Sequence, residues 1–179
     1  MIAAMRRAIP MLLLLLMPHQ AMAQTRFEVS GGYALARDSR DQVTLPAGWM
    51  AGATIDLTPA FAAVVDVSGQ YKTVALLNAD ARLSIHTALA GVRSSVRLGR
   101  VTEFGQIVAG VVRTSGSAFG ATTTVHAIGV QPGAGVDYPL TPRWAARAEL
   151  DVRLIAAQQD AQNGGTQLRF AVCLVYRHR

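Results

Sequence analysis

The chain has 179 residues, of which 51% are hydrophobic and 16% are charged, and its formal net charge is +6. This length suits one domain, and the basic residues are scattered rather than gathered in the stripe that nucleic-acid binding requires, so we expect no nucleic-acid partner. The single cysteine, Cys173, excludes an intramolecular disulfide and a cysteine-cluster metal site, and no motif implies a cofactor.

The N-terminus predicts export from the cytoplasm. Arg6 and Arg7 precede an apolar run at residues 11–17, and Ala21-Met22-Ala23 has the small-x-small pattern of a cleavage site. No later stretch approaches the roughly 20 consecutive apolar residues that a membrane-spanning helix needs. We therefore predict a signal peptide at residues 1–23, removed after Ala23, followed by one mature domain at residues 24–179.

From residue 26 onward the chain returns repeatedly to an alternation of period two, which is typical of strands because their successive side chains point to opposite faces. In chain order the expected strands cover residues 26–36, 48–57, 61–71, 84–98, 101–113, 124–138, 143–155 and 166–177. The fourth strand is assigned with Arg93 inward because an unpaired arginine is costly in lipid, and the phase of the fifth stays open. Pro132 interrupts the sixth strand, since proline cannot donate to a ladder.

Short turns and long connections alternate between these strands. Short turns are expected near residues 58, 99 and 141, and polar loops at residues 37–46, 72–83, 114–123 and 156–165. Short turns at one rim and longer loops at the other are typical of outer-membrane barrels. The sequence LTPAFAA at residues 57–63 is echoed by LTPRWAA at residues 140–146, which places both turns on the same rim.

The strand at residues 143–155 has one apolar and one charged face. The apolar series contains Trp144, Ala146, Ala148, Leu150, Val152 and Leu154, and the charged series contains Arg147, Glu149, Asp151 and Arg153. In a soluble sandwich or carrier the charged face would meet water, whereas in a membrane barrel the apolar face would meet lipid.

Aromatic residues sort to the two ends of the expected strands. Transmembrane barrels collect aromatic residues in two girdles at the membrane interfaces, whereas a soluble core would place them along strand centres. We expect a girdle at the turn rim made of Phe27, Phe61, Phe104, Tyr138, Trp144 and Tyr176, and a second near the loop rim made of Tyr33, Trp49, Tyr71 and Phe170. This sorting favours lipid outside the barrel.

With these segments placed, the chain resembles the OmpA-like family of small eight-stranded outer-membrane barrels. Members often carry a strand such as GAGVDY, found here at residues 133–138 before a turn, and a second short phrase is GRVT at residues 99–102. The resemblance implies an all-β, eight-stranded antiparallel up-and-down transmembrane β-barrel in the cell outer membrane, surrounded by lipid and monomeric. The sequence departs from the family after Tyr176, because family members usually end on an aromatic residue.

An eight-stranded barrel is only wide enough for side chains to fill it. Inward-facing charges must then pair with one another, because removing an ion from water without a partner costs several kcal/mol. We expect a lumen charge network made of Glu28, Asp56, Asp66, Arg93, Asp137, Arg147, Glu149, Asp151, Arg153 and Arg169. This network is expected to close the lumen, with a narrow gated pore as the alternative.

Three functions remain open at this point. The leading hypothesis is an outer-membrane barrel with a structural, surface-interaction or weak-pore, porin-like role. The first alternative is a soluble periplasmic, lipocalin-like carrier of a hydrophobic ligand. The second is a lipid-modifying barrel enzyme that uses His86 or His126, but neither histidine has a recognisable motif beside it, so we expect no catalytic residues. No loop motif indicates an extracellular partner.

Overall fold

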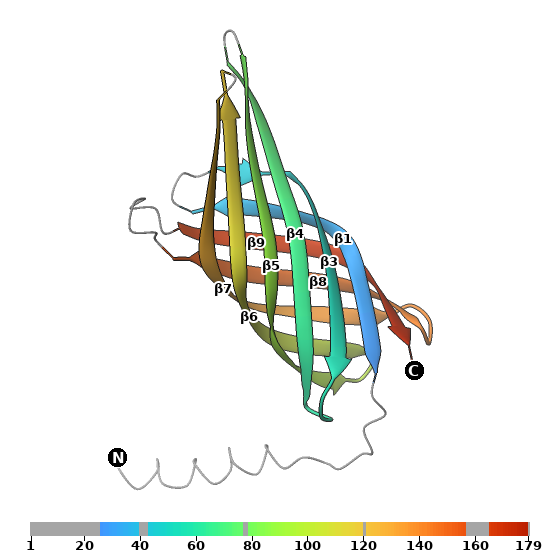
Figure 1. Ribbon diagram of the computed structural model, residues 1–179. Helices are drawn as coiled ribbons and strands as arrows, with labels where there is room; N and C mark the ends of the chain where they lie inside the picture. Colours follow the sequence, from blue (N-terminus) through green and yellow to red (C-terminus); the bar gives the residue numbers. More distant parts are fainter. Residues whose placement is uncertain (1–25, 40–42, 77–78, 120, 157–164, 179) are drawn as a thin grey trace, which may run out of the picture.

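The computed structural model describes residues 26–39, 43–76, 79–119, 121–156 and 165–178, so the predicted signal peptide lies outside the described residues. The described chain forms one closed antiparallel sheet (Figure 1). Its long strands are β1 (Phe27–Asp38), β3 (Ala47–Asp56), β4 (Phe61–Leu76), β5 (Ala79–Leu98), β6 (Val101–Ala118), β7 (Ala121–Pro139), β8 (Trp144–Ile155) and β9 (Gly165–His178). The described residues contain no helix with the length and apolar composition needed to cross a bilayer.

The sheet closes because β9 pairs back onto β1, while every other long strand pairs with its neighbours in the chain. Moving from each residue to its partner on the next strand, a path once round the barrel starts at Ala36 of β1 and returns at Arg26, ten residues earlier in the chain. The residues on this path are Arg169, Asp151, Gly133, Gln106, Arg93, Ala62 and Asp56. With about 3.3 Å per residue and about 4.8 Å between strands, this stagger tilts the strands by roughly 40°. The tilt is within the range of closed barrels.

Alternation of side chains separates the interior from the outer surface on each strand. In β8, Ala145, Arg147, Glu149, Asp151 and Arg153 are buried, whereas the residues between them include exposed leucine and valine. The same alternation resolves the phase of β6, the fifth long strand, in which Gln106, Val108 and Val112 face inward and Ile107 and Val111 face outward. The predicted fold class is therefore confirmed.

Two predicted loops are wrong, because residues 72–83 and 114–123 lie mainly in strands. Strand β4 runs to Leu76 and β5 begins at Ala79, while β6 runs to Ala118 and β7 begins at Ala121. The hairpins β4–β5 and β6–β7 therefore rise beyond the other strands (Figure 1). Beyond the apolar band neither face of a strand must be apolar, so the alternation that marked the strands disappears although the ladder hydrogen bonds continue.

The predicted loop at residues 37–46 also contains pairing. Strand β1 continues to Asp38, and the short strand β2 (Thr44–Leu45) pairs with Ala36 and Arg37. Leu45 is buried and packs with Ile85 and Val112, so β2 lies over the interior rather than away from it.

The repeated LTP sequence forms the same turn twice. The hydroxyl of Thr58 accepts hydrogen bonds from the backbone amides of Ala60 and Phe61, at 3.3 and 3.0 Å. Thr141 accepts the corresponding bonds from Arg143 and Trp144 at the same distances. Both turns lie at one end of the barrel, which we call the turn end, and the projecting hairpins mark the opposite, hairpin end.

Pro132 affects the pairing of β7 with β8, as its chemistry requires. Bridges run on both sides of it, from Val130 to Leu154 and from Gly133 to Asp151, in one register without a bulge. The two positions between lack bridges to β8, while Pro132 still pairs with Ile107 of β6. Proline is tolerated here because only one side of the strand loses a donor.

Candidate functional site

The barrel interior holds a buried ion cluster centred on Arg169 of β9. Its guanidinium donates to both carboxylate oxygens of Asp66 at 2.9 Å, and it contacts Asp151 at 2.8 Å and Glu149 at 2.7 Å. Each of these four side chains is at most 3% exposed. We call Asp66, Glu149, Asp151 and Arg169 the central cluster; three strands, β4, β8 and β9, hold it together across the lumen.

Arg93 and Gln106 connect the central cluster to the opposite wall. Arg93 of β5 donates to the Gln106 side-chain oxygen at 3.1 and 2.6 Å, and its guanidinium lies 3.7 Å from Glu149. The Gln106 amide nitrogen donates to Glu149 at 3.0 Å and to Asp151 at 3.4 Å. One guanidinium and one amide thus bring positive charge and donors to carboxylates that Arg169 alone would not neutralise.

A second polar layer surrounds Arg153, on the hairpin side of the central cluster. Its guanidinium donates to the side-chain oxygens of Gln131 at 2.9 Å, Gln167 at 3.3 Å and Gln70 at 3.4 Å, and to the Ser68 hydroxyl at 3.3 Å. These acceptors are neutral. The buried Arg153 charge is therefore stabilised in this layer by hydrogen-bond acceptors on three other strands and not by a carboxylate.

A third group, the rim cluster, lies near the turn end and contains Glu28, Asp137, Arg147 and Arg177. Arg147 donates to both Asp137 oxygens at 2.7 and 2.8 Å and to Glu28 at 3.2 Å. Arg177 donates to Glu28 at 2.8 Å and to Asp137 at 2.7 Å. Two guanidinium groups therefore share two carboxylates, which leaves the cluster formally neutral.

Phe104 lies inside the barrel, which corrects its predicted place in the aromatic girdle. The side chain is 5% exposed, and its ring lies under two guanidinium carbons, that of Arg93 at 4.0 Å and that of Arg147 at 4.7 Å. The face of an aromatic ring attracts cations, most strongly where water is excluded. Phe104 therefore separates the central and rim clusters and makes a cation–π contact with an arginine on each side. The phase of this strand cannot be read from the sequence, and the position of Phe104 near a strand end is what led to its prediction as an interfacial residue.

Glycines of β7 make room for these groups. A β-carbon added to Gly133 would lie 1.8 Å from the Asp151 carboxylate oxygen, and one added to Gly135 would lie 2.5 Å from the Phe104 ring. A side chain at either position would displace a member of the interior network, so the glycine run serves packing here.

The interior is closed at the level of these layers. Arg153, Arg169, Asp151 and Gln131 are 0% exposed, so these side chains are out of contact with solvent. Toward the hairpin end, Leu45 of β2 packs with Ile85 and Val112, with Val43, Leu83 and Ile155 around them. At the turn end lies a cavity of about 530 Å³, which the rim cluster lines together with other residues that include Asp56 and Arg93. The described layers thus leave a vestibule at one end and no open path through the centre.

The ten residues predicted for the lumen all lie on inward-facing positions. The structure joins nine of them to the groups above, and places Asp56 in the wall of the vestibule. The predicted lumen network left out the neutral and aromatic members of the interior, Gln70, Gln106, Gln131, Gln167, Ser68 and Phe104, and the rim residue Arg177. Strand parity was the signal that could have found the glutamines.

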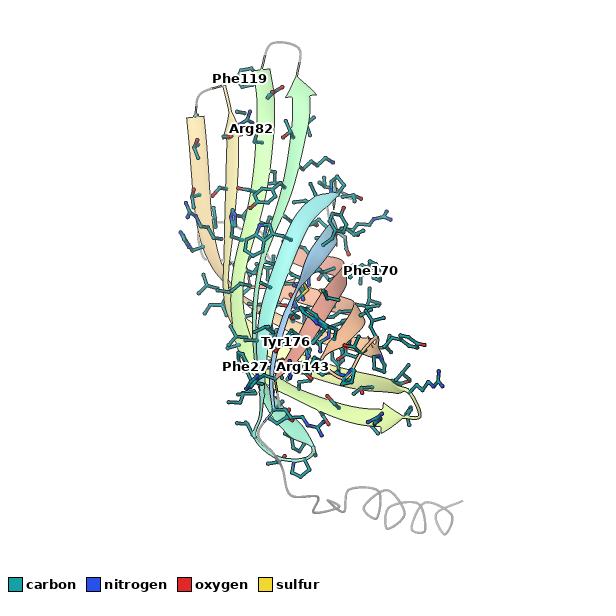
Figure 2. All side chains as sticks on the ribbon, turned by 90° about the vertical axis from the view of Figure 1, so that its right-hand side faces the viewer. Phe27, Arg82, Phe119, Arg143, Phe170 and Tyr176 are labelled. Atoms are coloured by element: carbon teal, nitrogen blue, oxygen red, sulfur yellow. The ribbon has the colours of Figure 1, made fainter. Side chains whose placement is uncertain are left out.

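The remaining aromatic residues of the two predicted girdles lie on the outer surface. Figure 2 shows Phe27 and Tyr176 near the turn end, and Phe170 further toward the hairpins. Trp144 and Tyr176 pack together with ring centroids 5.0 Å apart, and the Trp49 indole donates to the Tyr71 hydroxyl at 3.1 Å. Nine of the ten predicted girdle residues, all but Phe104, therefore face outward.

The orientation of β8 bears on the carrier alternative. A lipocalin-like carrier requires Arg147, Glu149, Asp151 and Arg153 to face water, and the structure buries all four inside the barrel. The enzyme alternative rested on His86 and His126, which lie on the outer face of β5 and β7. The His86 ring nitrogen is hydrogen-bonded to the Tyr71 hydroxyl at 3.0 Å.

These features define the class: the chain has the fold of the small eight-stranded outer-membrane β-barrels. One similar solved structure is that of Ail, the attachment invasion locus protein of Yersinia pestis, in complex with the heparin analogue sucrose octasulfate. The TM-score is 0.64 and the sequence identity is 17%, and the match covers 87% of this chain and 100% of that one. Neisserial surface protein A, with a TM-score of 0.64 and 16% identity, covers 87% and 96%. The N-terminal barrel of Pseudomonas aeruginosa OprF, with a TM-score of 0.60 and 11% identity, covers 87% and 100%. No family model and no curated protein sequence matches the chain.

Proposed function

We propose that this protein is an outer-membrane barrel with a closed interior that acts through its surface at the hairpin end. The observation that carries the proposal is the interior itself. Arg153 and Arg169, the two largest fully buried side chains, cross the lumen and bind partners on other strands. Contacts of this kind between strands make the barrel rigid, and the side chains that form them leave no room for a solute.

The outer surface supports a membrane location. Large apolar side chains are exposed on every long strand, among them Val65, Val92, Ile107, Leu150 and Leu174, each close to half exposed. A soluble monomer rarely exposes a contiguous apolar surface of this extent, whereas lipid requires one. Aromatic residues border this band at both ends, as they do at membrane interfaces.

The shape of the hairpin end supports a surface-interaction role. Strands β4 to β7 continue past the apolar band as two hairpins, and Figure 2 places Arg82 and Phe119 near their tips. Phe119 is 73% exposed and has a positive φ of 51°, so a large apolar side chain is held away from the barrel at a turn. Ail, a barrel of similar fold, has been solved with a sulfated sugar bound, which supports ligand binding as one use of this architecture.

Membrane location and orientation can be tested with two cysteine variants in a Cys173→Ala background, because Cys173 is the chain's own thiol and is buried. Thr122→Cys lies on an exposed position of the β6–β7 hairpin, and Arg143→Cys lies on an exposed position at the turn end. We expect a membrane-impermeant maleimide to label Thr122→Cys in intact cells, and Arg143→Cys only after the outer membrane is permeabilised.

Two results would contradict the proposal. Release of the mature protein as a soluble periplasmic species without detergent would exclude the membrane location. Equal labelling of both variants in intact cells would exclude the orientation.

A further inference from the structure

A row of basic and imidazole side chains crosses the outer face of three neighbouring strands. His86 of β5 is paired with Arg113 of β6, and Arg113 is paired with His126 of β7. All three residues have outward parity, Arg113 and His126 are exposed, and His86 is half-buried. With Tyr71, which is hydrogen-bonded to His86, they form what we call the outer polar row.

The outer polar row lies where the apolar band ends. Along each of its strands, the outward residue two places toward the turn end is apolar, Ala88 before His86, Val111 before Arg113 and Ile128 before His126. Val111 and Ile128 are more than half exposed, as lipid-facing residues are. The change from apolar to basic occurs within one outward position on all three strands, so the row occupies the level of the lipid headgroups if the barrel spans the membrane as proposed.

Hydrogen bonds hold part of the row in place. Tyr71 accepts from the Trp49 indole at 3.1 Å and its hydroxyl is 3.0 Å from the His86 ring nitrogen. Tryptophan and tyrosine favour the membrane interface because one end of each is apolar and the other polar. The aromatic girdle and the basic residues therefore form one connected surface instead of two separate features.

Hydroxyl groups lie directly beyond the row. Ser84, Ser115 and Thr124 are the next outward residues on the same strands and are paired with one another across β5, β6 and β7. The Ser115 and Thr124 hydroxyls are 3.0 Å apart and share a hydrogen bond. A cation bordered by hydroxyls and imidazoles offers several donors to one oxyanion.

The charge of this sector is positive. Arg113 takes part in none of the salt bridges formed between the described residues. Further along the hairpin, Arg82 also faces outward, and Asp80 is the acidic residue on the outer face of the same strand. Arginine presents a planar fork of donors that matches phosphate geometry, and it is always charged.

We infer that the outer polar row binds a phosphate group of an anionic glycolipid in the outer leaflet, with Arg113 as the principal contact. His86 and His126 flank the phosphate, and Tyr71 orients His86. The inference rests on the proposed membrane location, because only a barrel in a bilayer places this row beside lipid headgroups. The inference adds a specific lipid site to the proposed function, which by itself depends only on the closed interior and the projecting hairpins.

The test uses the full-length mature protein refolded in detergent. The protein is titrated with lipid A that carries two phosphates, and separately with the same lipid after dephosphorylation. Native mass spectrometry counts the bound lipid. We expect the phosphorylated lipid to bind about tenfold more tightly than the dephosphorylated one, as suits a charge-assisted contact. Arg113→Gln should weaken its binding by about tenfold, and Arg113→Lys should recover part of the loss, since lysine keeps the charge but not the fork. The double variant His86→Gln/His126→Gln should give a smaller loss.

Arg143→Gln is the matched control, because it removes one exposed arginine at the turn end (Figure 2), whereas the row lies on the hairpin side of the apolar band. Its lipid affinity should equal that of the wild type. The inference is overturned if Arg113→Gln binds like Arg143→Gln, or if dephosphorylation leaves affinity unchanged. Insertion into phosphatidylcholine vesicles is measured first for each variant, so that failure to insert counts against the proposed function, whereas insertion without phosphate preference counts against this site alone.

Discussion

Arg169 and Asp66 form a two-point ion pair inside the barrel, with both contacts at 2.9 Å between residues 103 positions apart in the chain. Strands β9 and β4, which carry them, are not neighbours in the sheet. The pair therefore fixes the diameter of the barrel in a way that ladder hydrogen bonds between adjacent strands do not.

Arg169→Gln should destabilise the barrel strongly. It leaves Asp66, Glu149 and Asp151 without their shared cation in a buried site, and breaking a buried pair costs about 3–5 kcal/mol. Urea unfolding of the protein in lipid vesicles, followed by tryptophan fluorescence, measures the free energy of unfolding. The exposed Arg143→Gln should stay within about 0.5 kcal/mol of the wild type.

The double variant Asp66→Asn/Arg169→Gln separates pairing from loss of packing. It should be less destabilised than the sum of the single variants, with a coupling of about 0.5–3 kcal/mol, because neither partner is then left charged and alone. Simple additivity would show that the two residues act independently, against the geometry described above.

Gly133→Ala should be costly and Gly105→Ala should not. The added β-carbon at Gly133 would overlap the Asp151 carboxylate, whereas at Gly105 nothing lies within 4 Å. Overpacking of this kind typically costs about 1–3 kcal/mol. Alanine at Gly105 should be neutral or gain up to about 1 kcal/mol, since glycine loses more conformational entropy on folding. Equal effects in the same unfolding assay would argue that the interior can relax around position 133.

Thr58→Ala and Thr141→Ala should have similar, modest effects. Each removes a hydroxyl that accepts two backbone hydrogen bonds in the repeated turn, at a cost of about 0.5–1.5 kcal/mol. Since the turns are separate, the double variant should show the sum of both losses. Thr122→Ala, on an exposed hairpin position, is the control and should leave stability unchanged.

The wild-type protein should produce no conductance steps in planar bilayers, because its central side chains are inaccessible to water. Arg153→Ala/Arg169→Ala removes the two largest of them and should produce measurable ion flow. Leu89→Ala shortens a buried apolar side chain of the same interior and should remain silent. Steps in the wild type would favour the weak-pore hypothesis over the closed barrel.

Strand parity was readable from the sequence wherever the two faces differ in chemistry. In the strand at residues 143–155, the charged and apolar series predicted an inside and an outside, and lipid on one side with a narrow lumen on the other imposes that division. The phase of residues 101–113 could not be read because both faces are largely apolar, and Phe104 was misplaced for that reason. Strand ends beyond the membrane were also missed, since Ser, Thr and Ala at residues 114–123 satisfy either a strand or a loop.

By itself, then, the sequence determined the number of long strands, the rim that holds the short turns, and the inward position of ten charged residues, but not that of Arg177 in the rim cluster. Only the tertiary structure decided how those charges are paired. Partners such as Arg177 and Glu28 lie 149 positions apart, and Arg147 joins Asp137 and Glu28 at once. Such contacts depend on the stagger of the closed sheet, which sets the height of each inward residue and is a property of all the strands together.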